Sequence, residues 1–117
     1  APTFLDAAGL PRRIDMQGIS MWQHWCGSGT SRDHALIENH HNGRAVHLRT
    51  LVTDRYKLTV YRGHPWGELF DLSTDRQELV NLFDDPAARD VRDAMLRKLI
   101  DADLDREPAP QPRVSGA

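Results

Sequence analysis

The sequence is poor in cysteine, long apolar runs and unbalanced charge, and each shortage excludes a class of protein. A single cysteine, Cys26, rules out a disulfide within the chain. No apolar stretch approaches the ~20 residues that a helix needs to span a bilayer. The 15 Lys and Arg residues nearly balance the 17 Asp and Glu residues, so a surface that attracts phosphate groups is not expected. We therefore expect no nucleic-acid partner and no membrane partner.

What is present indicates one globular domain. The 117 residues are 39% hydrophobic and 27% charged, which is typical of a chain with a single modest core. The sequence begins without Met and without a basic-then-apolar signal segment. Its opening, APTFLDAAGLP, predicts a short helix that stops at Gly9 and Pro11. Because barely two helical turns are present, we expect the chain to be a piece of something longer.

Four stretches in the middle of the chain alternate apolar and polar residues and predict strands, over 35–39, 44–53, 56–63 and 68–72. The first two are separated by His-His-Asn-Gly, whose Asn-Gly pair favours a tight hairpin. Before them, Met21, Trp22 and Trp25 are spaced to share one side of a single helical turn. These signals predict an antiparallel sheet.

A long helix is predicted from Pro86 to about Arg106. Asp85 is a good N-cap, and proline fits the first helical position because its missing N–H costs nothing there. Its apolar stripe consists of Val91, Met95, Leu99 and Ala102, widened by Leu96 and Ile100. The fold class is therefore α+β: a four-stranded antiparallel sheet with one long C-terminal helix packed on it and a short N-terminal helix. Residues 1–106 form the domain, and the Pro-rich residues 107–117 are expected to be a disordered tail.

The stretch GELFDLSTDRQELVNLFDDP is rich in carboxylates, the groups that form metal sites and acid/base pairs. A calcium loop starting at Asp71 would need Gly at its sixth position and Glu at its twelfth, where Arg76 and Leu82 stand. A catalytic pair of carboxylates stays open in principle, although solvated acids in turns are far commoner. Asp75 and Glu78 have the spacing of a capping box. They predict a helix start at QELVNLF, as Asp84 and Asp85 do for the long helix, and we expect no metal site.

The six histidines and the lone cysteine are candidate zinc ligands, and the cysteine is also a candidate nucleophile. Adjacent His40 and His41 point to opposite faces of a strand, and His24 and Cys26 converge only in an extended segment. No Cys-x-x-Cys or His-x-x-x-His spacing occurs. Cys26 lacks a recognisable scaffold for nucleophilic catalysis, so we expect a buried, inert thiol beside Trp22 and Trp25.

The order of these segments resembles the C-terminal subdomain of sulfatases, members of the alkaline-phosphatase-like superfamily. The pieces are APTFLDAAGLP, MQGISM, LVTDRYKLTVYRG and the acidic stretch, over about residues 1–105. The most specific piece is the family pattern Glu-Leu-Tyr-Asp-Leu-x-x-Asp-Pro-x-Glu-x-x-Asn-Leu. This sequence matches it from Glu68 to Leu82, with Phe70 for Tyr and Arg76 for Pro. Neither departure affects a reactive group, although Arg76 should loosen the turn slightly.

The resemblance implies sulfuric ester hydrolysis by a longer enzyme. Sulfatases use a formylglycine made from a Cys in a Cys-x-Pro/Ala-x-Arg motif, beside a calcium-type divalent cation. Cys26 is followed by Gly27, Ser28, Gly29 and Thr30, so it does not match that motif. The resemblance therefore implies no catalytic and no metal-binding residue in this chain, which alone should be inactive. It implies a role beside the N-terminal catalytic domain, shaping the edge of the substrate pocket, with His64 and Trp66 as the candidate residues.

Two alternatives stay open from the sequence. The chain can instead be a stand-alone interaction or dimerisation module without catalytic activity, and under either interpretation an exposed apolar face should favour self-association. His64 and Trp66 can equally belong to an ordinary exposed hairpin loop. A histidine metal site is a weaker third hypothesis.

Overall fold

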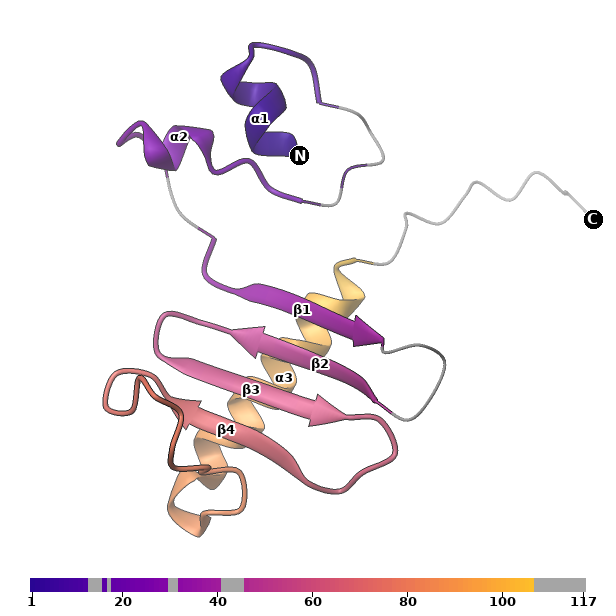
Figure 1. Cartoon of the computed structure of the whole chain (residues 1–117), viewed down its shortest axis with the longest axis vertical. Coiled ribbons are helices and arrows are strands. Elements are labelled where there is room, and N and C mark those ends of the chain that lie inside the picture. Colours follow the sequence, from indigo (N-terminus) through magenta and orange to yellow (C-terminus); the bar gives the residue numbers. More distant parts are fainter. Residues whose placement is uncertain (13–15, 17, 30–31, 41–45, 107–117) are drawn as a thin grey trace, which may run out of the picture.

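A four-stranded antiparallel sheet with one long helix across its back forms the centre of the computed structural model (Figure 1). The structure describes residues 1–12, 16, 18–29, 32–40 and 46–106. The strands lie in chain order and are β1 (Ala35–His40), β2 (His47–Val52), β3 (Tyr56–Tyr61) and β4 (Gly67–Asp71). The helices are α1 (Pro2–Ala7), α2 (Trp22–Trp25), the 3-10 turn η1 (Pro86–Ala88) and α3 (Arg89–Leu104). The predicted α+β class is confirmed.

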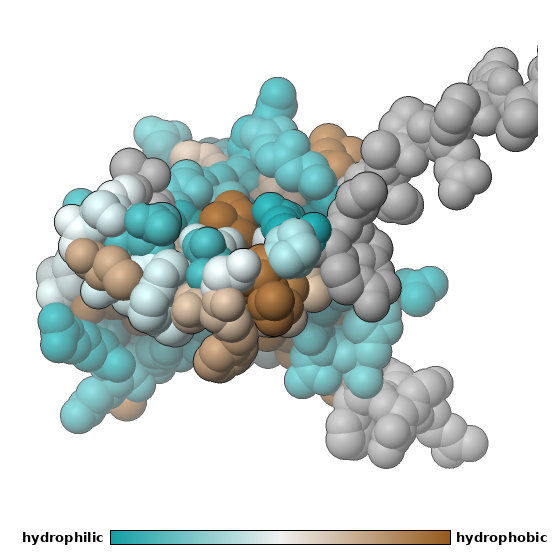
Figure 2. Space-filling model, turned by 90° about the horizontal axis from the view of Figure 1, so that it is seen from above, coloured by the Kyte–Doolittle hydropathy of each residue, from teal (hydrophilic) through white to brown (hydrophobic). Residues whose placement is uncertain are grey.

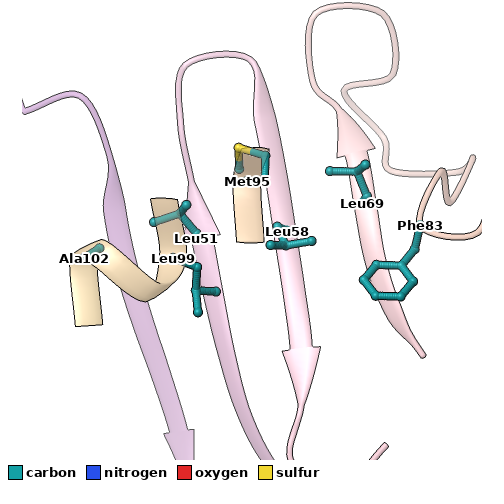
Figure 3. Close-up of a cluster of buried hydrophobic side chains, with 7 residues drawn as sticks. All are labelled: Leu51, Leu58, Leu69, Phe83, Met95, Leu99 and Ala102. Carbon is teal, nitrogen blue, oxygen red and sulfur yellow. The ribbon is translucent and has the colours of Figure 1, made fainter. Parts of the chain in front are cut away.

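The core lies between the sheet and α3. The register places Leu51 opposite Leu58 and Leu58 opposite Leu69, and all three are fully buried. Figure 3 shows these side chains together with Phe83, Met95, Leu99 and Ala102, which complete the buried cluster. Burial of each large aliphatic side chain contributes about 1.5–3 kcal/mol, so this layer is the main source of stability.

The start of α3 follows the predicted capping chemistry. The Asp85 carboxylate accepts a hydrogen bond from the Ala87 N–H at 2.9 Å, and Pro86 is the first residue of η1. Met95, Leu99 and Ala102 are buried as expected. Ile100 differs from the expectation: its side chain is 53% exposed, because it lies on the side of α3 away from the sheet.

The predicted helix at QELVNLF is wrong. Residues 72–85 form turns and extended backbone, and this segment returns along the outer edge of β4. Asn81 holds it there: its Oδ1 accepts from the N–H groups of Leu69 and Phe83, and its Nδ2 donates to the Gly67 carbonyl, each at 3.0 Å. The Leu82 N–H donates to the Leu69 carbonyl at 2.8 Å. These long-range bonds satisfy β4 backbone groups that would otherwise be unpaired, and a local helix could not supply them.

The helices α1 and α2 pack against each other, away from the core between the sheet and α3 (Figure 1). The short N-terminal helix is confirmed, and it ends before Gly9, whose φ is +67°. Neither α1 nor α2 buries a residue, and Phe4 and Trp25 are 75% and 63% exposed. Figure 2 shows brown and tan surface at this end of the molecule.

Three predictions involve residues outside the described ones: the Asn-Gly turn, the placement of His41 opposite His40, and the tail 107–117. Within the described part of the chain, no helix combines the length and apolar character needed to span a membrane.

Candidate functional site

His64 and Trp66, the candidate pocket-edge residues, lie in the loop that joins β3 to β4. Gly63 opens this loop with a φ of +77°, a left-handed conformation that glycine adopts without steric cost. The His64 N–H then donates to the Tyr61 carbonyl at 3.2 Å. Both side chains are exposed, Trp66 by 47%. The loop therefore presents two aromatic rings at one end of the sheet.

The structure adds Tyr61 and Glu68 to these two residues. The Trp66 ring lies 4.4 Å from the Tyr61 ring and 5.1 Å from the His64 ring, between centroids. The Tyr61 hydroxyl donates to Glu68 Oε1 at 3.1 Å. We call these four residues the hairpin cluster. Sequence reasoning missed Tyr61 and Glu68, although strand alternation places both on one face of the hairpin, where diagonal neighbours come within reach.

The electrostatics of the hairpin cluster follow from partial burial. Burial raises the pKa of Tyr61, and the hydrogen bond to Glu68 raises it further, because both disfavour the phenolate. The tyrosine is therefore a neutral donor that fixes the carboxylate. The cluster offers aromatic surface, an imidazole and an oriented carboxylate, which suits contact with a polar organic molecule rather than bond cleavage.

Three other acids of the carboxylate-rich stretch, Asp71, Asp75 and Glu78, have structural partners, but these are not the partners of a capping box. The Asp71 carboxylate binds the Arg55 guanidinium through both oxygens, with contacts of 2.9, 3.2 and 3.4 Å. It also accepts from the Ser73 N–H and hydroxyl. The hydrogen bonds from Arg55 and then Ser73 lower the pKa of Asp71 to about 2. Its oxygens are thus engaged within the protein, which argues against a catalytic role.

Asp75 and Glu78 likewise stabilise the returning segment. Asp75 accepts from the Val80 N–H at 2.8 Å, five residues on rather than three. Glu78 has a φ of +57°, rare for a residue with a side chain, and forms an ion pair with Lys57 of β3 at 2.6 Å. The predicted capping box is therefore wrong, because long-range contacts fix both residues outside a helix.

Two of the histidines come together at the ends of β1 and β2. The rings of His40 and His47 are 3.8 Å apart, and Arg49 Nη1 lies 3.3 and 3.1 Å from their Nε2 atoms. Arg49 also binds Glu38 at 2.9 Å and Asp103 of α3 at 3.4 Å. The Arg49 guanidinium thus lies beside the Nε2 atoms of both imidazoles. Through its carboxylate partners it links β2 to β1 and to α3.

Cys26 is exposed at the end of α2, so the expectation of a buried thiol is wrong. The helix is a single turn of four residues, too short to bury its C-cap against Trp22 and Trp25. His24 lies in the same turn and is exposed. Across the described ranges, no group of three or more His, Cys, Asp or Glu side chains is placed to hold a metal ion.

A hollow at the domain's edge is separate from the hairpin cluster. Its volume is about 640 Å³, and it lies between residues 32–36 and the end of α3. Its wall carries charges of both signs, Arg32 and Arg106 beside Asp33 and Asp105. Neither His64 nor Trp66 lines this hollow.

The family model described as "N-sulphoglucosamine sulphohydrolase, C-terminal" matches residues 1–105. The chain belongs to this family. This match confirms the resemblance to a sulfatase C-terminal domain seen in the acidic stretch. Asn81 and Leu82 of the family pattern close the β4 edge in this structure.

Solved structures agree with the family. A sulfatase from Bacteroides thetaiotaomicron VPI-5482 is 29% identical with a TM-score of 0.76, and a 2-O GAG sulfatase is 29% identical with a TM-score of 0.77. For both, the match covers 90% of this chain and 23% of the other. The phosphonate monoester hydrolase of Agrobacterium radiobacter is 26% identical, with a TM-score of 0.68, over 88% of this chain and 23% of that enzyme. None of the curated proteins matches the chain. The sulfatase C-terminal domain thus spans about a quarter of these relatives.

Proposed function

We propose that this sulfatase C-terminal domain belongs to a longer hydrolase of sulfuric esters, in which it packs against the catalytic domain and forms part of the substrate-pocket edge. The family match over residues 1–105 carries the proposal. The formylglycine and the calcium-type cation would lie in the catalytic domain, because no Cys-x-Pro/Ala-x-Arg motif occurs in this sequence. The chain's own part is to position substrate, through His64 and Trp66.

The names of the relatives suggest a substrate class to test first. The family is named for a sulphohydrolase of N-sulphoglucosamine, and one relative is a 2-O GAG sulfatase. A sulfated saccharide is therefore the first candidate. A phosphonate monoester is the second, because the phosphonate monoester hydrolase is 26% identical to this chain over the aligned residues.

The first experiment reads the DNA upstream of Ala1 and expresses the longer reading frame. We expect it to encode Cys-x-Pro/Ala-x-Arg and its product to hydrolyse an aryl sulfate and a sulfated saccharide. The 117-residue chain alone should show no turnover above a blank. A nearby start codon without such an extension would instead favour a stand-alone interaction module.

A matched pair of tryptophan variants tests the pocket edge in the longer protein. Trp66→Ala should raise KM by about 2- to 13-fold and change kcat less, since one aromatic contact is worth about 0.5–1.5 kcal/mol. Trp25→Ala, which removes an exposed tryptophan of α2, should leave both unchanged. His64→Ala should act in the same direction as Trp66→Ala. Equal kinetics for the Trp66 and Trp25 variants would remove the hairpin cluster from the pocket edge.

A further inference from the structure

Two of the described histidines, His40 and His47, have a cation at their ring nitrogens. They stand opposite each other in the register of β1 with β2, and the Nε2 atoms of both lie beside the Arg49 guanidinium. His34 gives the contrast, because its Nδ1 lies 2.7 Å from an Asp33 carboxylate oxygen. A proton on an imidazole strengthens a contact with a carboxylate and weakens one with a guanidinium. Acid should therefore act on these two places in opposite directions.

The hydrogen bonds of Arg49 require both imidazoles to be neutral. A guanidinium only donates, so the Nε2 atoms of His40 and His47 must be the acceptors, at 3.3 and 3.1 Å from Nη1. An imidazole that is protonated on Nε2 has no lone pair there and cannot accept. The other donors bind carboxylates: Nη2 contacts Glu38 at 2.9 Å, and Nε contacts Asp103 of α3 at 3.4 Å. We call these five residues the Arg49 cluster.

The charges around the Arg49 cluster balance only while the imidazoles are neutral. Arg106, just beyond α3, also binds Glu38, at 2.8 Å. The cations Arg49 and Arg106 therefore face two anions, Glu38 and Asp103. A third cation, Arg62 just after β3, adds positive potential at the β2 imidazole. Each proton taken up by an imidazole thus adds a positive charge to a group whose anions are already paired.

The pKa of His47 has the direction that this geometry requires. Partial burial lowers it most, and the neighbouring His40 and Arg49 lower it further. Because the folded state disfavours the proton, the stabilisation is complete above the unfolded histidine value of about 6.5 and is lost as the pH falls below it. This window lies well above the range in which carboxylates titrate.

We propose that the Arg49 cluster is an acid-sensitive latch between the end of β1 and α3. At neutral pH the two imidazoles hold the guanidinium in the position from which it binds Glu38 and Asp103. In acid, each imidazole takes up one proton from solvent at Nε2, which breaks its bond to Arg49 and repels the guanidinium. The end of β1 then loses its side-chain link to α3. The latch needs only residues of this chain, so it does not depend on the proposed function.

Urea unfolding of the 117-residue chain at about pH 7.5 and about pH 5 tests the latch. The comparison is between the unmodified chain and the double variant His40→Gln, His47→Gln, because glutamine accepts a hydrogen bond from Arg49 and does not titrate. Acidification should raise the unfolding equilibrium constant of the unmodified chain about 2- to 13-fold more than that of the double variant, the worth of one hydrogen bond. His24→Gln, at an exposed position of α2, should behave like the unmodified chain.

A second measurement on the unmodified chain keeps the test decisive if the double variant does not fold. Hydrogen exchange should show protection of the β1 amides falling with the same midpoint as the His47 imidazole titration followed by NMR, while the β3 amides stay protected. The proposal is overturned if the unmodified chain and the double variant respond equally to acid. Equal loss of protection in β1 and β3, or no loss in β1, overturns it as well. None of these outcomes bears on sulfate ester hydrolysis by the longer protein.

Discussion

The sheet with α3 and the pair α1–α2 both contain large apolar side chains, but only the sheet with α3 buries them. The first part encloses Leu51, Leu58 and Leu69 completely, whereas α1 and α2 bury nothing and expose Phe4 and Trp25. The difference is geometric: six- and four-residue helices offer too little area to cover each other, while four paired strands and a sixteen-residue helix enclose a layer. Stability should therefore reside almost wholly in residues 35–106.

The largest expected effect compares one side chain from each part. Leu58→Ala removes a fully buried side chain and should lower the free energy of unfolding by about 2–5 kcal/mol. Phe4→Ala removes a larger side chain that is 75% exposed and should change it by less than about 0.5 kcal/mol. Urea unfolding followed by circular dichroism measures both. A loss for Phe4→Ala as large as that for Leu58→Ala would show that α1 shares the core.

The next effect tests the closed edge of β4. Asn81→Ala leaves two N–H groups and one carbonyl without their partner, and should cost about 1–3 kcal/mol. Asn39→Ala, at an exposed position of β1, is the matched control and should be nearly neutral. Hydrogen exchange should also become faster at the Leu69 amide in the Asn81 variant. Unchanged exchange there would contradict the assigned role.

A smaller effect belongs to the start of α3. Asp85→Ala removes the carboxylate that accepts from the Ala87 N–H and should cost about 1 kcal/mol in thermal or urea unfolding. Its neighbour Asp84 provides the control, since Asp84→Ala preserves that bond. If the two alanine variants are equally stable, the cap contributes nothing.

The smallest effect is a dependence on acid pH. Asp71 has its pKa lowered from 3.8 to about 2 by Arg55 and Ser73, and Asp33 has the same shift through Lys98 and then His34. Because these pKa values are lower in the folded state, the stabilisation is present in full above the unfolded value and is lost as pH falls from about 4 to about 2. Asp71→Asn should flatten that part of the stability profile, and Asp54→Asn should not. Identical profiles would contradict the role given to Arg55.

The parts of the fold that the sequence predicted are those with repeated local signals. Alternation along the strands and the stripe of α3 recur over several turns or residue pairs, so each is supported many times. The helix predicted within residues 72–85 is wrong because the local capping pattern competes with distant partners. Glu78 pairs with Lys57, and Asn81 bonds the β4 backbone. Nothing in the spacing of Asp75 and Glu78 reveals those partners.

The candidate site was predicted only in outline. His64 and Trp66 followed from the family resemblance and a loop, and their approach to Tyr61 and Glu68 depends on the register of β3 with β4. The burial of Cys26 was predicted wrongly. Helical spacing shows which side chains share a face, but it does not show whether another element covers that face.

The use of a side chain to finish β4 also determines how the sheet could polymerise. One margin of the sheet, at β4, is occupied by Asn81 and Leu82, while in the described part of the chain no strand pairs with the far margin, at β1. A sheet with one available margin can join only one neighbour in that way, so growth ends at two copies. If the β4 margin were open as well, each copy could pair on both sides and the sheet could extend into filaments.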